Sequence, residues 1–398
     1  MLPEVKLKPR EIKNNVWWVG AIDWDRRLFD SLIPLPDGTS YNTYLIKGKD
    51  KTVLIDSPDP TMTEVLWGHL EAVEKIDYVI SLHAEQDHSG SIPEILRRYR
   101  EARVVTSSQG KGMLMDLLHL PEESIITVRD GEKLPLGAKT LEFIYTPWVH
   151  WPETMCAFLE EDRLLFSCDL FGSHLATSEL FVRDEARVLE AAKRYYAEIM
   201  MPFRKIIQKN LEKLATKPVE IIAPSHGPLY DRPEFIIKAY RHWVDDKPKN
   251  LVVIAYVTMH GSTARMVTHL VSALVERGVE VRQFNLATTD IGKLAMSLVD
   301  AATVILAAPT VNVGPHPAAF MAAGLVNMLR PKVKFISLVS SYGWSTKIEE
   351  QVLNLMGNIK AEILPAVIIR GLPREADFKA LENLALNIAQ KHRLLGLS

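Results

Sequence analysis

Several features that would place this chain in a specialised class are scarce or missing from its 398 residues. Only two cysteines occur, Cys156 and Cys168, too few for a disulfide framework or a cysteine-ligated iron–sulfur cluster. No apolar run reaches the roughly 18 residues that a membrane span requires, and the N-terminal segment lacks the layout of a signal peptide. We therefore expect a cytoplasmic protein without membrane attachment. Cys168 ends the apolar run LLFSC, so we interpret it as a packing residue rather than a reactive thiol.

An excess of positive charge is also missing. The formal net charge is −2, and no basic run or stripe is present, so binding to a nucleic-acid backbone has no electrostatic support. Hydrophobic residues make up 47% and charged residues 24% of the chain, which is typical of a globular protein rather than a disordered one. The length is too great for one ordinary core and suits two or three domains.

The pattern of expected strands and helices divides the chain in two. Short β-rich runs and helical stretches alternate irregularly in the first part, which includes a long helical region over residues 184–214. The polar segment DDKPKN, Asp245–Asn250, is the best linker candidate, and we place the boundary between residues 1–248 and 249–398. Beyond it, five apolar strands alternate with helices, which predicts a flavodoxin-like, doubly wound parallel sheet covered on both faces.

Potential metal ligands follow several β-runs of the first part. His83, His150, Asp169 and His226 each stand at the end of a separate run, and the loop HAEQDH adds further donors beside His83. Ligand sites commonly lie beyond strand ends in α/β proteins, so we expect these side chains to converge. The full set is His83, Glu85, Asp87, His88, His150, Asp169 and His226.

Seven donors suit two metals better than one. A plausible division gives His83, Glu85 and His150 to the first metal, gives Asp87, His88 and His226 to the second, and lets Asp169 bridge them. Carboxylate oxygens favour harder and more highly charged ions than imidazole nitrogens do, although the donor set alone does not exclude manganese or zinc. Glu85 stands where zinc hydrolases with an H-x-H-x-D-H loop have a second histidine.

A second candidate site lies in the other part of the chain, where YVTMHGSTARM reads as a strand, a turn and the start of a helix. Hydroxyls, a glycine and free helix N–H groups would together cradle a phosphate, although such a turn also simply caps a helix. No G-x-G-x-x-G is present here and G-x-x-x-x-G-K-[ST] is also missing, which argues against a dinucleotide or a nucleoside triphosphate. The cradle residues are Thr258, Met259, His260, Gly261, Ser262 and Thr263.

The seven metal-ligand candidates resemble the di-iron site of the flavodiiron proteins. That family joins a metallo-β-lactamase-like αββα domain to a flavodoxin-like FMN domain, and the resemblance covers essentially the whole chain in that order. It therefore implies an α/β chain with an N-terminal αββα sandwich, a C-terminal flavodoxin-like domain, two iron ions and FMN. The loops after the third and fourth strands would then hold the flavin ring, through Pro309, Thr310, Val311, Asn312, Val313, Gly314, Ser341, Tyr342, Gly343 and Trp344.

The resemblance also implies a function. A flavodiiron oxidoreductase passes electrons from FMN to the iron pair, which reduces O2 to water, NO to N2O, or both. Rubredoxin or a reduced deazaflavin coenzyme would donate the electrons, and a head-to-tail homodimer or a dimer of dimers would bring flavin and iron together. Tyr195 and His174 would line the metal pocket, although core packing explains either one equally well. The alternatives are a binuclear zinc hydrolase on the same fold and an electron carrier with an inert sandwich domain.

Overall fold

The computed structural model describes residues 7–397, and the chain forms two compact units. One unit contains the chain up to Tyr196 together with Phe203–Val244, and the other joins Ala197–Pro202 to the chain from Asp245 onward. The linker carries no helix or strand between Val244 and Leu251, in agreement with its polar composition. No helix within residues 7–397 has both the length and the apolar character needed to cross a bilayer.

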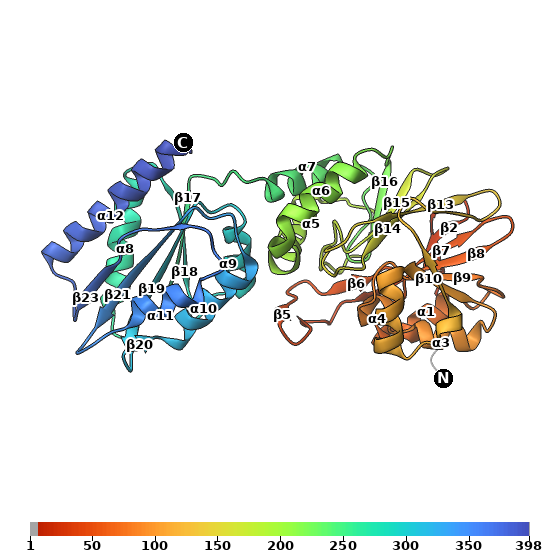
Figure 1. The fold of residues 1–398 in the computed structure, drawn as a ribbon, viewed down its shortest axis with the longest axis horizontal. Coiled ribbons are helices and arrows are strands. Elements are labelled where there is room, and N and C mark those ends of the chain that lie inside the picture. Colours follow the sequence, from red (N-terminus) through yellow and green to blue (C-terminus); the bar gives the residue numbers. More distant parts are fainter. Residues whose placement is uncertain (1–6, 398) are drawn as a thin grey trace. The chain divides into compact units, whose positions relative to one another are not determined.

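The first unit is built around two stacked β-sheets (Figure 1). The first sheet has seven strands in the order β1 (Arg10–Lys13), β2 (Val16–Trp18), β7 (Tyr44–Lys47), β8 (Thr52–Ile55), β9 (Tyr78–Ile80), β10 (Arg103–Ser107) and β11 (Ile125–Val128). The second sheet has five strands in the order β12 (Lys133–Pro135), β13 (Thr140–Tyr145), β14 (Met155–Leu159), β15 (Leu164–Cys168) and β16 (Ile221–Pro224).

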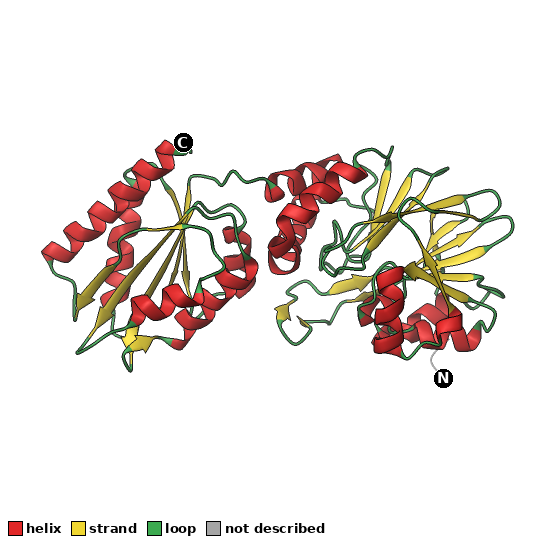
Figure 2. Cartoon of the chain, in the orientation of Figure 1, coloured by secondary structure: helices red, strands yellow, loops and turns green. Residues whose placement is uncertain are grey.

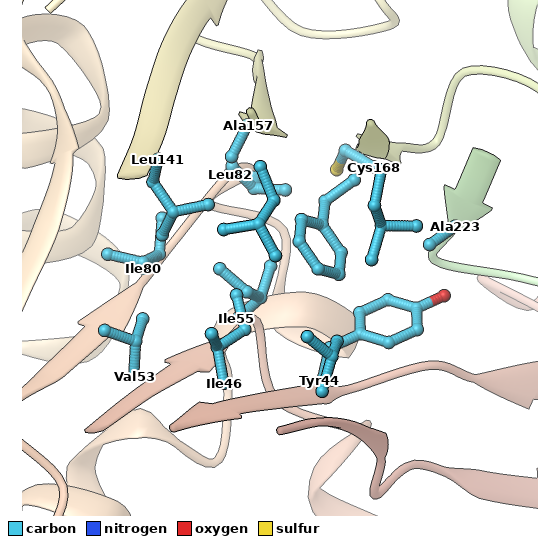
Figure 3. Packing of buried hydrophobic residues seen from close by; sticks show 14 of the residues in the cluster. Tyr44, Ile46, Val53, Ile55, Ile80, Leu82, Leu141, Ala157, Cys168 and Ala223 are labelled. Carbon is cyan, nitrogen blue, oxygen red and sulfur yellow. The ribbon is translucent and has the colours of Figure 1, made fainter. Parts of the chain in front are cut away.

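Apolar side chains hold these two sheets together. Val53 and Ile55 of β8 belong to the same buried cluster as Leu141 of β13 and Ala157 of β14 (Figure 3). Cys168 lies in this cluster with 2% of its surface exposed, in line with its interpretation as a packing residue. Each fully buried Val, Leu or Ile side chain contributes about 1.5–3 kcal/mol to the stability of the fold. The packing of the two inner faces therefore fixes how the sheets stack.

Helices cover the outer faces of the sandwich (Figure 2). The first sheet packs against α1 (Thr63–His69), α3 (Ile92–Arg98) and α4 (Ser108–Leu118). Side chains of α6 (Arg204–Leu214) and α7 (Glu234–Val244) lie against β15 and β16 of the second sheet. The αββα sandwich is therefore confirmed. Every residue of β14 and β15 is buried because both faces of these strands are covered.

The long helical region is not one α-helix. It divides into α5 (Glu185–Tyr195), a π-helical segment over Tyr196–Met200, a 3₁₀ turn over Met201–Phe203, and α6. Pro202 has no backbone N–H to donate and its ring crowds the preceding turn, so a regular helix cannot continue through it. This interruption separates α5, which carries Tyr195, from α6.

The second unit contains a parallel sheet in the order β18 (Glu280–Asn285), β17 (Leu251–Tyr256), β19 (Thr303–Val311), β21 (Phe335–Tyr342), followed by a fifth strand. In chain order this is 2-1-3-4-5, the flavodoxin-like arrangement predicted from the sequence. The fifth strand is split into β22 (Glu362–Ile363) and β23 (Val367–Arg370), which both pair with β21. Pro365 lies at the break because it cannot donate a ladder hydrogen bond.

Helices cover both faces of this sheet. The helices α8 (Ser262–Val275) and α12 (Glu375–Leu394) pack together against one face, through Leu270, Leu381 and Ile388 among others. The opposite face carries α9 (Ile291–Leu298), α10 (Pro317–Leu329) and α11 (Ile348–Leu355), as Figure 1 shows. The carboxyl ends of the parallel strands therefore open together at one edge, where a ligand can reach several loops at once.

Candidate metal centre and cofactor cavity

The seven predicted ligands come together from the ends of both sheets of the first unit. His83 follows β9. Glu85 directly precedes the short helix α2 (Gln86–Ser89), and Asp87 and His88 lie within this helix. The other three ligands come from the second sheet: His150 from the loop between β13 and β14, Asp169 directly after β15, and His226 just after β16. Because β15 and β16 run parallel, their carboxyl ends bring Asp169 and His226 to the same edge.

One group of donors forms around Glu85. The Nε2 atoms of His83 and His150 lie 3.0 and 3.1 Å from Glu85 Oε2. The same two nitrogens lie 3.5 and 3.6 Å from Asp169 Oδ2. Four donor atoms therefore lie within 4.8 Å of one another, close enough for a single metal ion to bind them together.

A second group forms around Asp87. The Nε2 atom of His88 lies 3.3 Å from Asp87 Oδ1, and the Nε2 atom of His226 lies 3.2 Å from Asp87 Oδ2. These two nitrogens lie 3.2 and 3.5 Å from Asp169 Oδ1. Asp169 thus turns one oxygen to each group, which is the geometry of a carboxylate that bridges two metals.

The negative charges of the carboxylates at this centre would balance the positive charges of bound cations. Among the described residues, all four side-chain oxygens of Asp87 and Asp169 are buried and accept no hydrogen bond. Burial alone would raise the pKa of Asp169, but His88, His83 and His226 hold it well below its usual range, so the carboxylate stays ionised. Buried anionic oxygens without donors are costly unless a cation is present. The nitrogen and oxygen donors therefore fit two transition-metal ions.

Tyr195 and His174 lie beside this group of donors. The rings of both contact the ring of His226, with centroids 5.9 and 4.9 Å away, and the two rings lie 4.8 Å from each other. Burial, followed by the charge of Asp169, holds the pKa of the Tyr195 phenol well above its usual range. Burial holds the pKa of His174 well below its usual range, so the ring is neutral. Its Nδ1 lies 2.9 Å from Thr39 Oγ1, and its buried Nε2 has no hydrogen-bond partner among the described residues.

Further residues of the centre were missed from the sequence. Phe29 lies over it, with its ring 5.1 Å from His174, and the neighbouring Asp30 reaches Glu85. Burial and the charges of Glu85 and Asp87 raise the pKa of Asp30 to about 6. Both residues belong to the hairpin of β4 (Leu28–Phe29) and β5 (Ile33–Pro34). No sequence signal pointed to this hairpin, because its residues carry neither a motif nor a regular pattern.

Three buried polar groups support the ligands from behind, and they were also missed. Glu153 bonds to the outer nitrogen of His83, and the backbone carbonyl of Ser40 accepts from Nδ1 of His226. Asp56 lies below His88, and its burial raises its pKa to about 7. Each of these groups comes from a segment distant from its histidine along the chain or from a loop without a recognisable pattern.

The second unit contains a cavity of about 480 Å³ at the carboxyl edge of its sheet. Eleven predicted cofactor residues line it: Met259, His260, Ser262, Pro309, Thr310, Val311, Asn312, Ser341, Tyr342, Gly343 and Trp344. The structure adds Gly371 and Leu372, from the loop after β23. The other five predicted residues lie in these loops or directly beside them, without lining the cavity: Thr258, Gly261, Thr263, Val313 and Gly314.

The first loop of the cavity has the form of a phosphate cradle. Gly261, with φ of +88°, precedes the first residue of α8, and the direction of its missing side chain is open space. Its N–H donates to Thr258 Oγ1 at 3.1 Å, and the hydroxyl of Ser262 lies 3.0 Å from that of Ser341. The buried hydroxyl of Thr263 has no partner among the described residues. Free helix N–H groups and these hydroxyls fit a phosphate monoester.

The second loop of the cavity is a tight turn between β19 and β20 (Gly314–Pro315). Its two central residues, Asn312 and Val313, have φ values of 48° and 73°. Valine rarely adopts this conformation, and strained backbone of this kind concentrates at ligand-binding loops. Trp344, from the next loop, is 73% exposed at the cavity. A flat aromatic ligand would therefore find both backbone groups and an aromatic ring in the lining of the cavity.

Comparisons with known proteins give matches that span both units. Residues 39–227 match a family model described as the ODP family beta lactamase. The nitric oxide reductase of Moorella thermoacetica is 32% identical over 96% of this chain and 99% of its own length. The coenzyme F420H(2) oxidase of Methanothermobacter marburgensis is 34% identical over 79% of this chain and 80% of its own.

Solved structures give the same result over the whole chain. The rubredoxin oxygen:oxidoreductase of Desulfovibrio gigas superimposes with a TM-score of 0.92 at 30% identity, covering 98% of this chain and 100% of that one. The flavodiiron protein of Giardia intestinalis superimposes with a TM-score of 0.91 at 26% identity and covers 98% of each chain.

Proposed function

Because this chain belongs to the flavodiiron proteins, we propose that it uses FMN and an iron pair to reduce O2 to water, NO to N2O, or both. The chain is an oxidoreductase, as its relatives are. The observation that carries the proposal is the position of Asp169, whose two oxygens face two separate groups of nitrogen and oxygen donors. When bound, FMN would supply electrons and the iron pair would supply the redox chemistry that reduces the diatomic substrate.

The chain's own residues would hold the metals and shield them. His83, Glu85 and His150 would hold one iron, and a second would be held by Asp87, His88 and His226, with Asp169 shared. Phe29, which is 5% exposed, closes the centre with an apolar ring and keeps bulk water away from it. His174 Nε2, without a partner among the described residues, is available to bind a small polar substrate or a water molecule.

Both proposed reactions consume protons as well as electrons, so a proton-bearing group beside the metals matters. The raised pKa keeps the Tyr195 phenol protonated throughout the neutral range, which makes it a permanent hydrogen-bond donor. Its ring packs against His174 and His226, so its hydroxyl is held in place beside Asp169. We assign it the role of donating to the oxygen of a bound substrate.

Substitution Tyr195→Phe tests that role. Removal of one preorganised donor costs roughly 100-fold in kcat, while the retained ring keeps the packing and the metal ligands in place. The measurement is turnover with O2 and with NO, together with iron and flavin analysis of the same sample. Turnover equal to that of the wild type would contradict the assignment, and loss of iron would show that the residue acts on metal binding instead.

The names of two relatives suggest the electron donor. One is named a coenzyme F420H(2) oxidase and another a rubredoxin-oxygen oxidoreductase, so a reduced deazaflavin or rubredoxin is the proposed donor. We propose a head-to-tail homodimer, or a dimer of dimers, in the cytoplasm. The proposed domains are residues 1–248, which bind iron, and residues 249–398, which bind FMN.

Metal and flavin content distinguish this function from a zinc hydrolase. An iron pair and a single FMN are expected in each purified chain, seen by elemental analysis and by the visible spectrum of an oxidised flavin. Three carboxylates around the centre favour the more highly charged ions of a redox pair, whereas a zinc hydrolase needs no oxidised state. A zinc pair without flavin would refute the proposal. Anaerobic kinetics with O2 and NO side by side would then determine which substrate is preferred.

A further inference from the structure

Glu153 is a buried carboxylate fixed directly behind a metal-ligand candidate. It lies in the loop between His150 and β14 with 3% of its surface exposed. Its Oε1 lies 2.6 Å from His83 Nδ1 and accepts a second hydrogen bond from the backbone N–H of Ala84 at 3.0 Å. Its backbone carbonyl accepts from Ser107 Oγ at 2.8 Å. The residue therefore holds both the ring of His83 and the backbone of the HAEQDH loop.

The contact also fixes which nitrogen of His83 faces the metal. With Nδ1 donating its proton to Glu153, the lone pair of Nε2 points to Glu85 and Asp169. The other carboxylate oxygen of Glu153 is buried and has no hydrogen-bond partner among the described residues. His83 and the Ala84 amide are thus the groups that compensate this negative charge, and the charge acts at short range in a dry environment.

The other histidines are supported differently. The Nδ1 atom of His226 lies 2.7 Å from a neutral acceptor, the backbone carbonyl of Ser40. His88 has Asp56 within 4.8 Å, and its ion pairs among the described residues are with Asp87 and Asp169 instead. Among residues 7–397, ion pairs with carboxylates at both ring nitrogens occur at His83 and at none of the three other ligand histidines.

The two metal positions are therefore unequal. A carboxylate that accepts the outer N–H of a ligand histidine makes the inner nitrogen more basic, and a charged acceptor does so more strongly than a carbonyl. A more basic ligand binds iron more tightly and stabilises the ferric ion more than the ferrous ion. The increase in ligand basicity is therefore larger at the metal position that contains His83. It is smaller at the position that contains His88 and His226.

We propose that Glu153 is a positioning residue that differentiates the two irons. The iron held by His83 is bound more tightly and is reduced at a lower potential than the iron held by His88 and His226. The inference rests on the proposed function, because it takes iron to fill both positions. It follows that electrons arriving at the centre reduce the His88–His226 iron first, and that a chelator removes that iron first.

The substitution Glu153→Gln removes the negative charge of the side chain while it nearly keeps its shape. The glutamine amide oxygen can still accept from His83 and from Ala84, so the loop keeps its support while the negative charge is removed. We expect iron affinity at the His83 position to fall about 10- to 100-fold, with the other position nearly unchanged. The potential of the more tightly bound iron should move to a more positive value, towards that of its partner.

The measurements use the full chain with FMN bound. Titration of the iron-free protein with ⁵⁷Fe(II) against a competing chelator, followed by Mössbauer spectroscopy, reports the occupancy of each position. A potentiometric titration followed by electron paramagnetic resonance reports the range in which the mixed-valence pair exists, and this range should narrow in the variant. The matched control is Glu142→Gln, which removes a buried carboxylate of β13 that pairs with Lys217 at 2.6 Å.

The results separate the inference from the proposed function. A Glu153→Gln variant that matches the control in both affinity and potential would overturn the inference. Equal weakening of both irons would also overturn it, because the residue would then support the centre as a whole. A wild-type chain that fails to bind an iron pair would instead refute the proposed function.

Discussion

Substitution Asp169→Ala should release both metal ions while FMN stays bound. Asp169 is 1% exposed, and one of its oxygens faces each group of donors, so its removal takes a ligand from both metals at once. The loss of affinity should exceed the roughly 10- to 100-fold that removal of an outer-shell partner causes. Activity with O2 and NO should fall to background. The flavin site lies in the other unit and keeps all of its lining residues.

The measurement is iron content beside the flavin spectrum, and a surface variant provides the control. Glu220→Ala removes an exposed ion pair with Arg163, which contributes about 1 kcal/mol or less, and should leave both cofactors in place. Alanine relieves the buried charge of Asp169, so the variant chain should still fold. If Asp169→Ala retained both irons, the bridging role would be refuted. If it lost one iron and kept the other, Asp169 would belong to a single position.

Substitution Ser262→Asp should have the opposite effect, with loss of FMN and retention of the iron pair. Ser262 is the first residue of α8 and lines the cavity at the phosphate cradle. An aspartate there would place a second anion beside the phosphate, which costs several kcal/mol and therefore about 100-fold or more in affinity. The same aspartate stabilises the start of the helix through its dipole, so reduced stability would not explain a loss of flavin.

Flavin titration of the cofactor-free protein measures this effect, with Ser262→Asn as the neutral control of similar size. The asparagine variant should bind FMN within about tenfold of the wild type, because it lacks the repelling charge. Equal losses in both variants would show that the position tolerates no larger side chain. FMN binding unchanged by the aspartate would place the phosphate elsewhere. Together, Ser262→Asp and Asp169→Ala show whether the binding of each cofactor depends only on the unit that holds it.

The metal-ligand candidates were identified from the sequence because strand ends converge in an α/β fold. His83, His150, Asp169 and His226 each follow a β-run, and the run itself is recognisable from its apolar residues. Glu85 was equally visible, since it departs from the pattern of zinc-binding loops. The flavodoxin-like, doubly wound sheet was predicted from the regular alternation of strands and helices in the second part, and its strand order came from the structure.

The flavin cavity was predicted in part. The loop after β17 was identified from its hydroxyls, its glycine and the start of a helix, and the loops after β19 and β21 were identified from the resemblance to the flavodiiron proteins. The loop with Gly371 and Leu372 was missed: the fifth strand before it was recognised, but the ring-binding residues were expected only in the loops after the third and fourth strands. Which residues of each loop face the cavity was not predictable either, because this depends on backbone dihedrals such as those of Asn312 and Val313.

The sequence by itself indicated the division of the chain into two parts, the seven candidate metal ligands and three of the four loops that line the cavity, because these depend on local apolar patterns, on the chemistry of single side chains and on motifs shared with a known family. The tertiary structure decided how the donors are shared and supported. The two oxygens of Asp169 face different histidines only after both sheets have stacked. Glu153 reaches His83, and Phe29 covers His174, across contacts between segments that no pattern along the chain connects.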